Sequence, residues 1–218
     1  MARPIMVAVG GDSGTGKAAL CAGLRSIYGD ERVAEVQLDG YFALNRMQRN
    51  AVELSPLDPR AHDFAAMDED LFQLSRGNAI TKPVYDHVMG AIAGTETIEP
   101  RSIVLVQGRF PLYTNVLRAL FDVSVWLERE PGLVLPWTIH RDAVEREGDE
   151  RARAAIERRR ADYAKYIAPQ AQYAGIRVRF THDDASAHRL DDALTTAQLR
   201  VARRIGALTG TRLDAVAP

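Results

Sequence analysis

A glycine-rich stretch near the start of the chain constrains its fold and chemistry most. An apolar run at 5–9 leads into Gly11, Asp12, Ser13, Gly14, Thr15, Gly16, Lys17 and Ala18, after which a helical pattern begins. Glycines let the backbone turn so tightly that successive N–H groups point into one concavity, which binds phosphate oxygens together with the following helix N-terminus. The G-x-x-x-x-G-K spacing therefore predicts a phosphate-binding loop at 11–18 in which Lys17 adds a positive charge. A plain glycine turn between a strand and a helix is the simpler alternative.

The position after the lysine departs from this pattern. A Ser or Thr usually stands there because its hydroxyl ligates magnesium, whereas this chain has Ala18. The loop thus predicts phosphate binding with one of the usual metal ligands missing.

Composition limits the function classes. The chain has 218 residues and a net charge of −1, so neither nucleic acid nor a membrane surface is an expected partner. The sequence lacks both an 18-residue apolar run and a signal peptide, which makes a cytoplasmic protein the expectation. The single cysteine, Cys21, cannot form an internal disulfide and is expected to be a small buried residue.

Strand-like and helix-like segments alternate along the chain. Strands are expected at 5–9, 33–38, 103–106, 123–127 and 176–180, and helices after the glycine loop and at 64–75, 112–120, 133–166 and 190–208. This alternation predicts one α/β domain over 1–218 with a doubly wound, mostly parallel sheet. Excursions on the substrate side are expected at about 40–65 and 78–100, a helical lid at about 136–165, and a frayed tail at 209–218.

Asp39 directly follows the second expected strand, so it lies at the same edge of the sheet as the phosphate loop. A carboxylate there can accept the proton of an attacking hydroxyl while the loop holds a nucleoside triphosphate. A turn residue before Gly40 explains the same aspartate. Arg46, seven residues on, is a candidate for an anionic substrate group or an exposed loop arginine.

Tyr85 and His87 stand two apart in an extended stretch behind Pro83. Side chains two apart on a strand point to the same face, so both are candidates for lining a substrate pocket. Edge-strand packing of Tyr85 beside an exposed His87 is the alternative.

Charged residues crowd the segment 141–160. Seven arginines there alternate with six acidic residues, so the local charge nearly cancels. A solvent-exposed helix with i,i+4 ion pairs explains this pattern. A lid whose arginines close over a transferring phosphoryl group explains it as well.

Taken together, motifs from about 5 to 180 resemble the phosphoribulokinase/uridine kinase family of P-loop kinases. The matching stretches are the glycine loop, the segment 39–42 with Arg46 downstream, and the segments 56–64, 82–90, 141–146 and 166–174. The resemblance implies an ATP-dependent kinase that uses Mg²⁺ and phosphorylates a hydroxyl of a sugar phosphate or nucleoside-like acceptor. Because members of such families are commonly oligomers, it also leaves a homo-oligomer open.

The resemblance implies a role for each matched position. Asp39 would be the catalytic base, and Lys17 with the loop amides would hold ATP phosphates. Asp142 would be a magnesium-associated carboxylate in the lid. The remaining substrate-side candidates are Tyr41, Arg46, Tyr85, His87, Arg141 and Arg146, the two lid arginines also being candidates for the transferring phosphoryl group.

Departures from the family pattern concentrate at positions 18 and 107, where the family is expected to hold magnesium and which we call the metal corner. Gln107 stands where family members usually carry a glutamate, in a motif that reads Gln107-Gly108-Arg109-Phe110-Pro111 here. An amide does not replace carboxylate charge near a metal. Ala18 and Gln107 together therefore motivate an alternative: a nucleotide-binding protein on the same fold that is catalytically degenerate or repurposed. Phe42 and Phe110, which replace histidines, further predict that ribulose 5-phosphate is a poor substrate or none.

Overall fold

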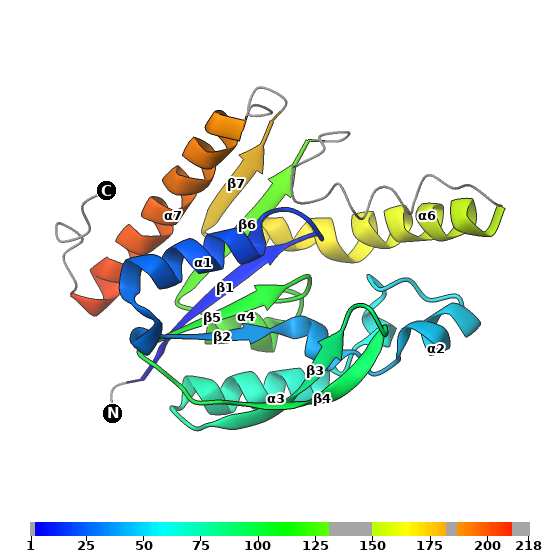
Figure 1. The fold of residues 1–218 in the computed structure, drawn as a ribbon, viewed down its shortest axis with the longest axis horizontal. Coiled ribbons are helices and arrows are strands. Elements are labelled where there is room, and N and C mark those ends of the chain that lie inside the picture. The colour runs from blue at the N-terminus through cyan, green and yellow to red at the C-terminus, as the bar shows by residue number, and fades with distance from the viewer. Residues whose placement is uncertain (1–2, 131–149, 182–186, 211–218) are drawn as a thin grey trace.

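Five parallel strands form the central sheet of the computed structural model, which describes residues 3–130, 150–181 and 187–210 (Figure 1). They are β1 (Ile5–Gly11), β2 (Val33–Gln37), β5 (Ile103–Gly108), β6 (Val123–Arg129) and β7 (Ile176–Phe180). Their order is β2-β5-β1-β6-β7, and every pair is parallel. The predicted doubly wound α/β class is confirmed.

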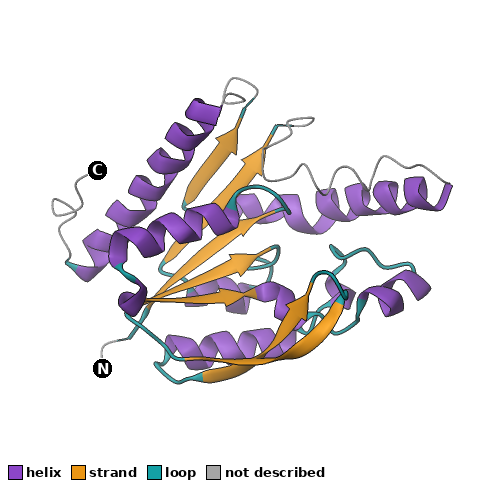
Figure 2. Ribbon diagram, in the orientation of Figure 1, coloured by secondary structure: helices purple, strands orange, loops and turns teal. Residues whose placement is uncertain are grey.

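Helices cover both faces of this sheet (Figure 2). On one face α1 (Lys17–Tyr28) and α7 (Ala187–Thr209) pack over alternate strand residues such as Val7 and Leu105. On the other, α3 (Phe64–Ser75) and α4 (Asn115–Leu120) pack over residues of opposite parity. Burial on both faces explains why β1 and β5 read as continuous apolar runs. No helix within the described part of the chain is both long and apolar enough to cross a membrane.

The expected excursion at 78–100 is an antiparallel hairpin outside the central sheet (Figure 1). Its strands are β3 (Ile80–Asp86) and β4 (Ala91–Ile98), with a register irregularity between Val84 and Tyr85. Ile80 and Ile98, at the open end of the hairpin, pack with the α3 side of the core. The rest of the hairpin therefore projects along the carboxyl edge of the sheet.

Two expected helices differ in extent. The helix expected at 112–120 begins at Asn115, because Thr114 caps it by accepting a hydrogen bond from the Leu117 N–H. Of the helix expected at 133–166, residues 133–149 lie outside the described residues. The described part is α6 (Glu150–Asp162), followed by a π-helical turn (Tyr163–Ile167) and a 3-10 helix (Ala168–Tyr173). Figure 1 shows α6 running past the carboxyl edge of the sheet.

Short elements complete the connections. They are α2 (Arg46–Ala51) and the 3-10 turns Asp30–Arg32, Leu38–Tyr41 and Pro59–Ala61. The turn Leu38–Tyr41 directly follows β2 and carries Asp39. It packs so closely against β3 that a Cβ built on Gly40 would lie 2.1 Å from the Pro83 carbonyl oxygen.

We expect Gly40→Ala to lower the free energy of unfolding by about 1–3 kcal/mol, because the methyl group would meet backbone rather than a yielding side chain. Urea denaturation measures the change. Gly94→Ala in β4 is the matched control: a Cβ there meets nothing within 4 Å, so its effect should stay within about 0.5 kcal/mol. Equal effects of the two substitutions would contradict this account of Gly40.

Candidate active site

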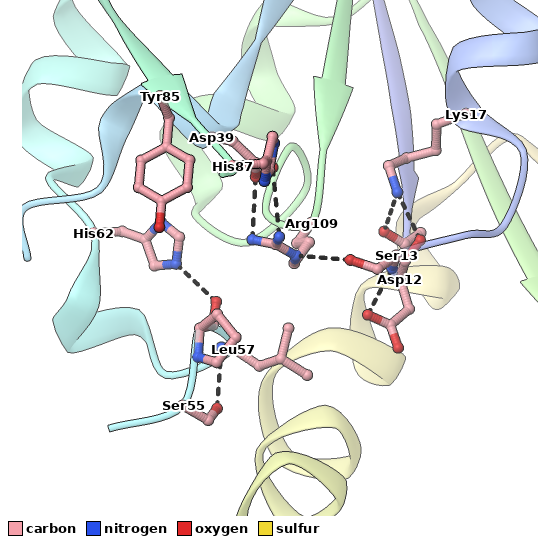
Figure 3. A network of polar contacts seen from close by, with 12 residues as sticks. Asp12, Ser13, Lys17, Asp39, Ser55, Leu57, His62, Tyr85, His87 and Arg109 are labelled. Carbon is pink, nitrogen blue, oxygen red and sulfur yellow. Dashed lines mark hydrogen bonds and ion pairs between the residues drawn. The ribbon is translucent and has the colours of Figure 1, made fainter. Parts of the chain in front are cut away.

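The glycine loop has the geometry of a phosphate cradle. Gly14 and Gly16 adopt positive φ angles of 73° and 87°, and α1 begins directly after Gly16 at Lys17. The Lys17 ammonium donates to the Gly11 and Asp12 carbonyl oxygens at 3.0 and 2.6 Å, so it lies folded along the loop (Figure 3). The buried Thr15 hydroxyl donates to the Asp12 carbonyl at 2.9 Å and braces the turn.

Asp39 faces this loop across a small cavity and is paired with a residue that the sequence motifs did not single out. Nη1 of Arg109 lies 3.1 Å from Oδ1 of Asp39, and its Nη2 donates to Oδ2 at 3.4 Å. Nε of Arg109 donates to the Ser13 hydroxyl at 3.5 Å, so one guanidinium connects Asp39 with the phosphate loop (Figure 3). A basic residue just beyond the end of a buried strand was the sequence signal for Arg109.

The ion pair decides the charge of Asp39. Burial alone favours the neutral acid, but the Arg109 guanidinium, followed by His87 and Lys17, outweighs it. The pKa of Asp39 consequently lies well below its ordinary value, so this carboxylate is ionised at neutral pH. His87 contributes through its Nε2, which lies 3.3 Å from Oδ2 of Asp39.

The metal corner lacks the donors that Mg²⁺ prefers. Ala18 offers no oxygen, and the buried Gln107 donates an amide N–H to the Glu35 carboxylate on the neighbouring strand. Glu35 interrupts an otherwise apolar strand, a signal that sequence reasoning left unused. Within 3–130, 150–181 and 187–210, no three His, Cys, Asp or Glu side chains gather closely enough to hold a metal. The side chains described at this corner therefore do not fit a divalent cation.

The hairpin and α2 lie next to Asp39. Tyr85, in β3, and His87, just beyond its end, have their ring centroids 5.2 Å apart, so the two side chains lie together as expected. The Tyr85 hydroxyl accepts a hydrogen bond at 3.0 Å from the buried Arg49, whose guanidinium lies 4.1 Å from the Phe42 ring centroid. Arg49 is a second cation that the sequence motifs did not single out, and it comes from α2.

An aromatic cluster lies next to Tyr85. The imidazole of His62 lies 4.4 Å from the Phe42 ring and 4.6 Å from the Phe110 ring, measured between centroids. Its Nε2 donates to the Pro56 carbonyl at 3.1 Å (Figure 3). Burial, and then the Arg109 guanidinium, lower the pKa of His62 to about 4, so the ring is neutral at pH 7.

Two predicted substrate-side residues are engaged elsewhere. Tyr41 is buried in the core and its hydroxyl donates to Asp70 at 2.8 Å, so its assignment to substrate binding is corrected. A 3-10 turn rotates successive side chains by about 120°, which points Tyr41 away from the face that carries Asp39. The guanidinium of Arg46 donates to the carbonyl oxygens of His87 and Val88 at the hairpin tip.

The helix α6 contacts both the phosphate loop and the loop that carries Ser55. Its Arg159 donates to Oδ1 of Asp12 at 2.7 Å, and Asp162 accepts a hydrogen bond from the Ser55 hydroxyl at 2.7 Å. The lid residues that the family pattern implicates, Arg141, Asp142 and Arg146, lie outside the described residues. Arg159 is the lid arginine that the described structure brings to the phosphate loop.

Comparison with known proteins identifies the family of the chain. Residues 6–187 match the Phosphoribulokinase / Uridine kinase family. The chain belongs to this family. A phosphoribulokinase of Synechocystis sp. is 37% identical over 175 residues, covering 80% of this chain and 53% of that protein. A Clostridium perfringens uridine kinase is 28% identical over 149 residues, covering 67% of this chain and 72% of that protein.

A solved member of the family shares the fold. The phosphoribulokinase from Rhodobacter spheroides superposes with a TM-score of 0.66 at 16% identity, covering 82% of this chain and 71% of that one. The present chain spans about half the length of the Synechocystis phosphoribulokinase it matches. Its family match ends at residue 187, where α7 begins.

The buried neutral imidazole of His62 predicts that the stability of the protein depends on pH. Below about pH 6.5 the unfolded chain binds a proton at His62, whereas the native state does so only near pH 4. Stability should therefore fall as the pH drops from 6.5 to 4, by about 3 kcal/mol from this group, and the loss should level off below pH 4. Urea denaturation across this range should show a flatter curve for His62→Phe than for wild type. Two parallel curves, separated only by a constant offset, would contradict the buried neutral histidine.

Proposed function

We propose that the chain is an ATP-dependent phosphotransferase whose acceptor is a hydroxyl of a small molecule, either a sugar phosphate or a nucleoside-like compound. One observation carries the proposal: Lys17 of the phosphate loop and the ionised Asp39 line the same cavity of about 60 Å³. A kinase needs this juxtaposition, because the donor phosphates and the acceptor hydroxyl must meet in line. Membership of the family supports the same activity.

The donor side would hold ATP through the backbone. The loop at 11–17 turns its amides toward one concavity at the N-terminus of α1, where the helix dipole also favours negative charge. Lys17 is held along the loop by the Gly11 and Asp12 carbonyl oxygens. Phosphate oxygens would draw its ammonium away from these carbonyls, since a charged acceptor makes the stronger hydrogen bond.

On the acceptor side, Asp39 would orient the attacking hydroxyl and take its proton. Because its pKa is low, Asp39 is always available as an acceptor but is a weak base. Its main contribution would then be to position the oxygen, with proton transfer following as the new bond to phosphorus forms. His87, 3.3 Å from Asp39, borders the place where this hydroxyl would lie.

Closure over the two substrates is assigned to the lid. Arg159 and Asp162 contact the phosphate loop and the loop at Ser55. We infer that Arg141 and Arg146 approach the transferring phosphoryl group from the same segment, as the family pattern implies. Excluding water there would favour transfer to the acceptor over hydrolysis.

The acceptor itself is proposed only by class. Relatives of this chain are named phosphoribulokinase and uridine kinase. The rings of Phe42 and Phe110 pack against the neutral His62, so this part of the pocket is less polar than histidines would make it. We therefore expect ribulose 5-phosphate to be a poor substrate or none.

A second candidate function is nucleotide binding without phosphoryl transfer. The specific observation in its favour is the buried ion pair between Arg109 and Asp39, which weakens Asp39 as a base. Ala18 and Gln107 favour it as well, because neither supplies a negatively charged metal ligand. Both candidates require ATP to bind, and they differ in turnover.

Two substitutions test the proposal. Lys17→Ala should abolish measurable ATP binding, and Asp39→Asn should lower turnover by about 10²–10⁴-fold, because the amide cannot accept the acceptor proton. Binding is measured by calorimetry. Turnover is measured by coupled ADP release with ribulose 5-phosphate, uridine and related acceptors, with and without Mg²⁺.

Arg177→Gln is the control, since Arg177 pairs with Glu128 at the far edge of the sheet and should leave both quantities unchanged. ATP binding without turnover beyond the Asp39→Asn level, for every acceptor, would select the second candidate. ATP binding that persists in the Lys17→Ala variant would contradict the phosphate-binding role of the loop, on which both candidate functions depend.

A further inference from the structure

The cavity between the phosphate loop and Asp39 has an unusual balance of charge. Lys17 and Arg109 line it as cations, Asp39 lines it as an anion, and Gln107 contributes a neutral amide. Ala18, the residue after Lys17, provides no side-chain oxygen. Among the described residues, the places from which a P-loop protein usually holds magnesium thus carry no negative charge, and a guanidinium stands beside them.

The structure fixes Arg109 firmly at this place. Its residue is 8% exposed, and its carbonyl accepts a hydrogen bond at 2.8 Å from the Gln170 amide, which is itself buried. Asp39 holds the terminal nitrogens, while Nε reaches Ser13 at 3.5 Å. A buried charge is costly unless it is paired, so the ion pair with Asp39 stabilises the Arg109 guanidinium at this place, next to the loop.

Such a guanidinium and a divalent cation would compete for the same anion. Two positive centres a few ångströms apart repel each other strongly in a partly desolvated cavity. A guanidinium also binds phosphate oxygens in a planar, forked geometry that a metal ion is not needed to arrange. Lys17 and Arg109 would therefore neutralise polyphosphate from two sides of the cavity.

We propose that Arg109 takes over the charge-neutralising role of the divalent cation, so that this chain binds the polyphosphate of metal-free ATP and does not require Mg²⁺ for nucleotide binding. This inference rests on the proposed nucleotide binding at the loop 11–17. It assigns to Arg109 a nucleotide-binding role that the motif pattern does not contain.

Calorimetric titration with ATP, once with Mg²⁺ and once with EDTA, tests the proposal. The wild-type Kd should differ by less than about threefold between the two conditions. Arg109→Met should weaken binding in EDTA by about tenfold or more, and Arg109→Lys should fall between them because it keeps the charge but loses the fork. Arg101→Met, at the opposite end of β5, removes the same charge and should change neither value.

Because Arg109→Met leaves the half-buried Asp39 without its main partner, the double variant Asp39→Asn/Arg109→Met is titrated as well. It removes both charges, so a folding defect caused by an unpaired carboxylate would be absent from it. Weakened metal-free binding in the double variant, with an unchanged thermal transition, would support the direct role of Arg109 on the nucleotide.

A reconstructed metal corner provides the reverse test. The triple variant Ala18→Ser/Gln107→Glu/Arg109→Met should bind ATP at least about tenfold more tightly with Mg²⁺ than with EDTA. Wild-type binding that already needs Mg²⁺ to this extent, with Arg109→Met no weaker in EDTA, would overturn the role of Arg109 while leaving the proposed function intact. Absence of ATP binding in both conditions would instead overturn the proposed function, and this inference with it.

Discussion

The buried ion pair between Arg109 and Asp39 joins the parts of the molecule that the site requires. Asp39 follows β2, Arg109 follows β5, and the same guanidinium reaches Ser13 in the phosphate loop. Three neighbouring segments at one edge of the sheet are thereby held by one charged contact. Since either charge alone would be costly in this place, the pair stabilises the geometry of the cavity as well as the ionised state of Asp39.

Substitutions around this pair are related by charge. A glutamate at position 107 would stand in the cavity lining beside Arg109 and Asp39, whereas Gln107 adds no charge there. Glu35, on the neighbouring strand, accepts a hydrogen bond from the Gln107 amide. Asp39 is thus the carboxylate that lines the cavity among the described residues, and it is paired with Arg109.

The fold, the glycine loop and the position of Asp39 follow from local sequence patterns. The glycine loop and Asp39 could be predicted because each depends on a turn next to a buried strand. The contact between Gln107 and Glu35 could not be predicted, because it requires β2 and β5 to be neighbours in the sheet. The order of the strands cannot be inferred from the sequence of either segment alone. The family pattern implied substrate binding for Tyr41, but the turn after β2 is 3-10 and directs its side chain into the core, where it contacts Asp70. Arg109 escaped notice because its importance comes from its partners across the cavity.

The helix α6 contacts two separate loops. Arg159 contacts Asp12 in the phosphate loop, and three residues further on Asp162 contacts Ser55. One helix therefore contacts both loops, so a ligand that moved α6 through one loop would also move the other. Thermodynamic reciprocity would make any resulting change of affinity equal in both directions.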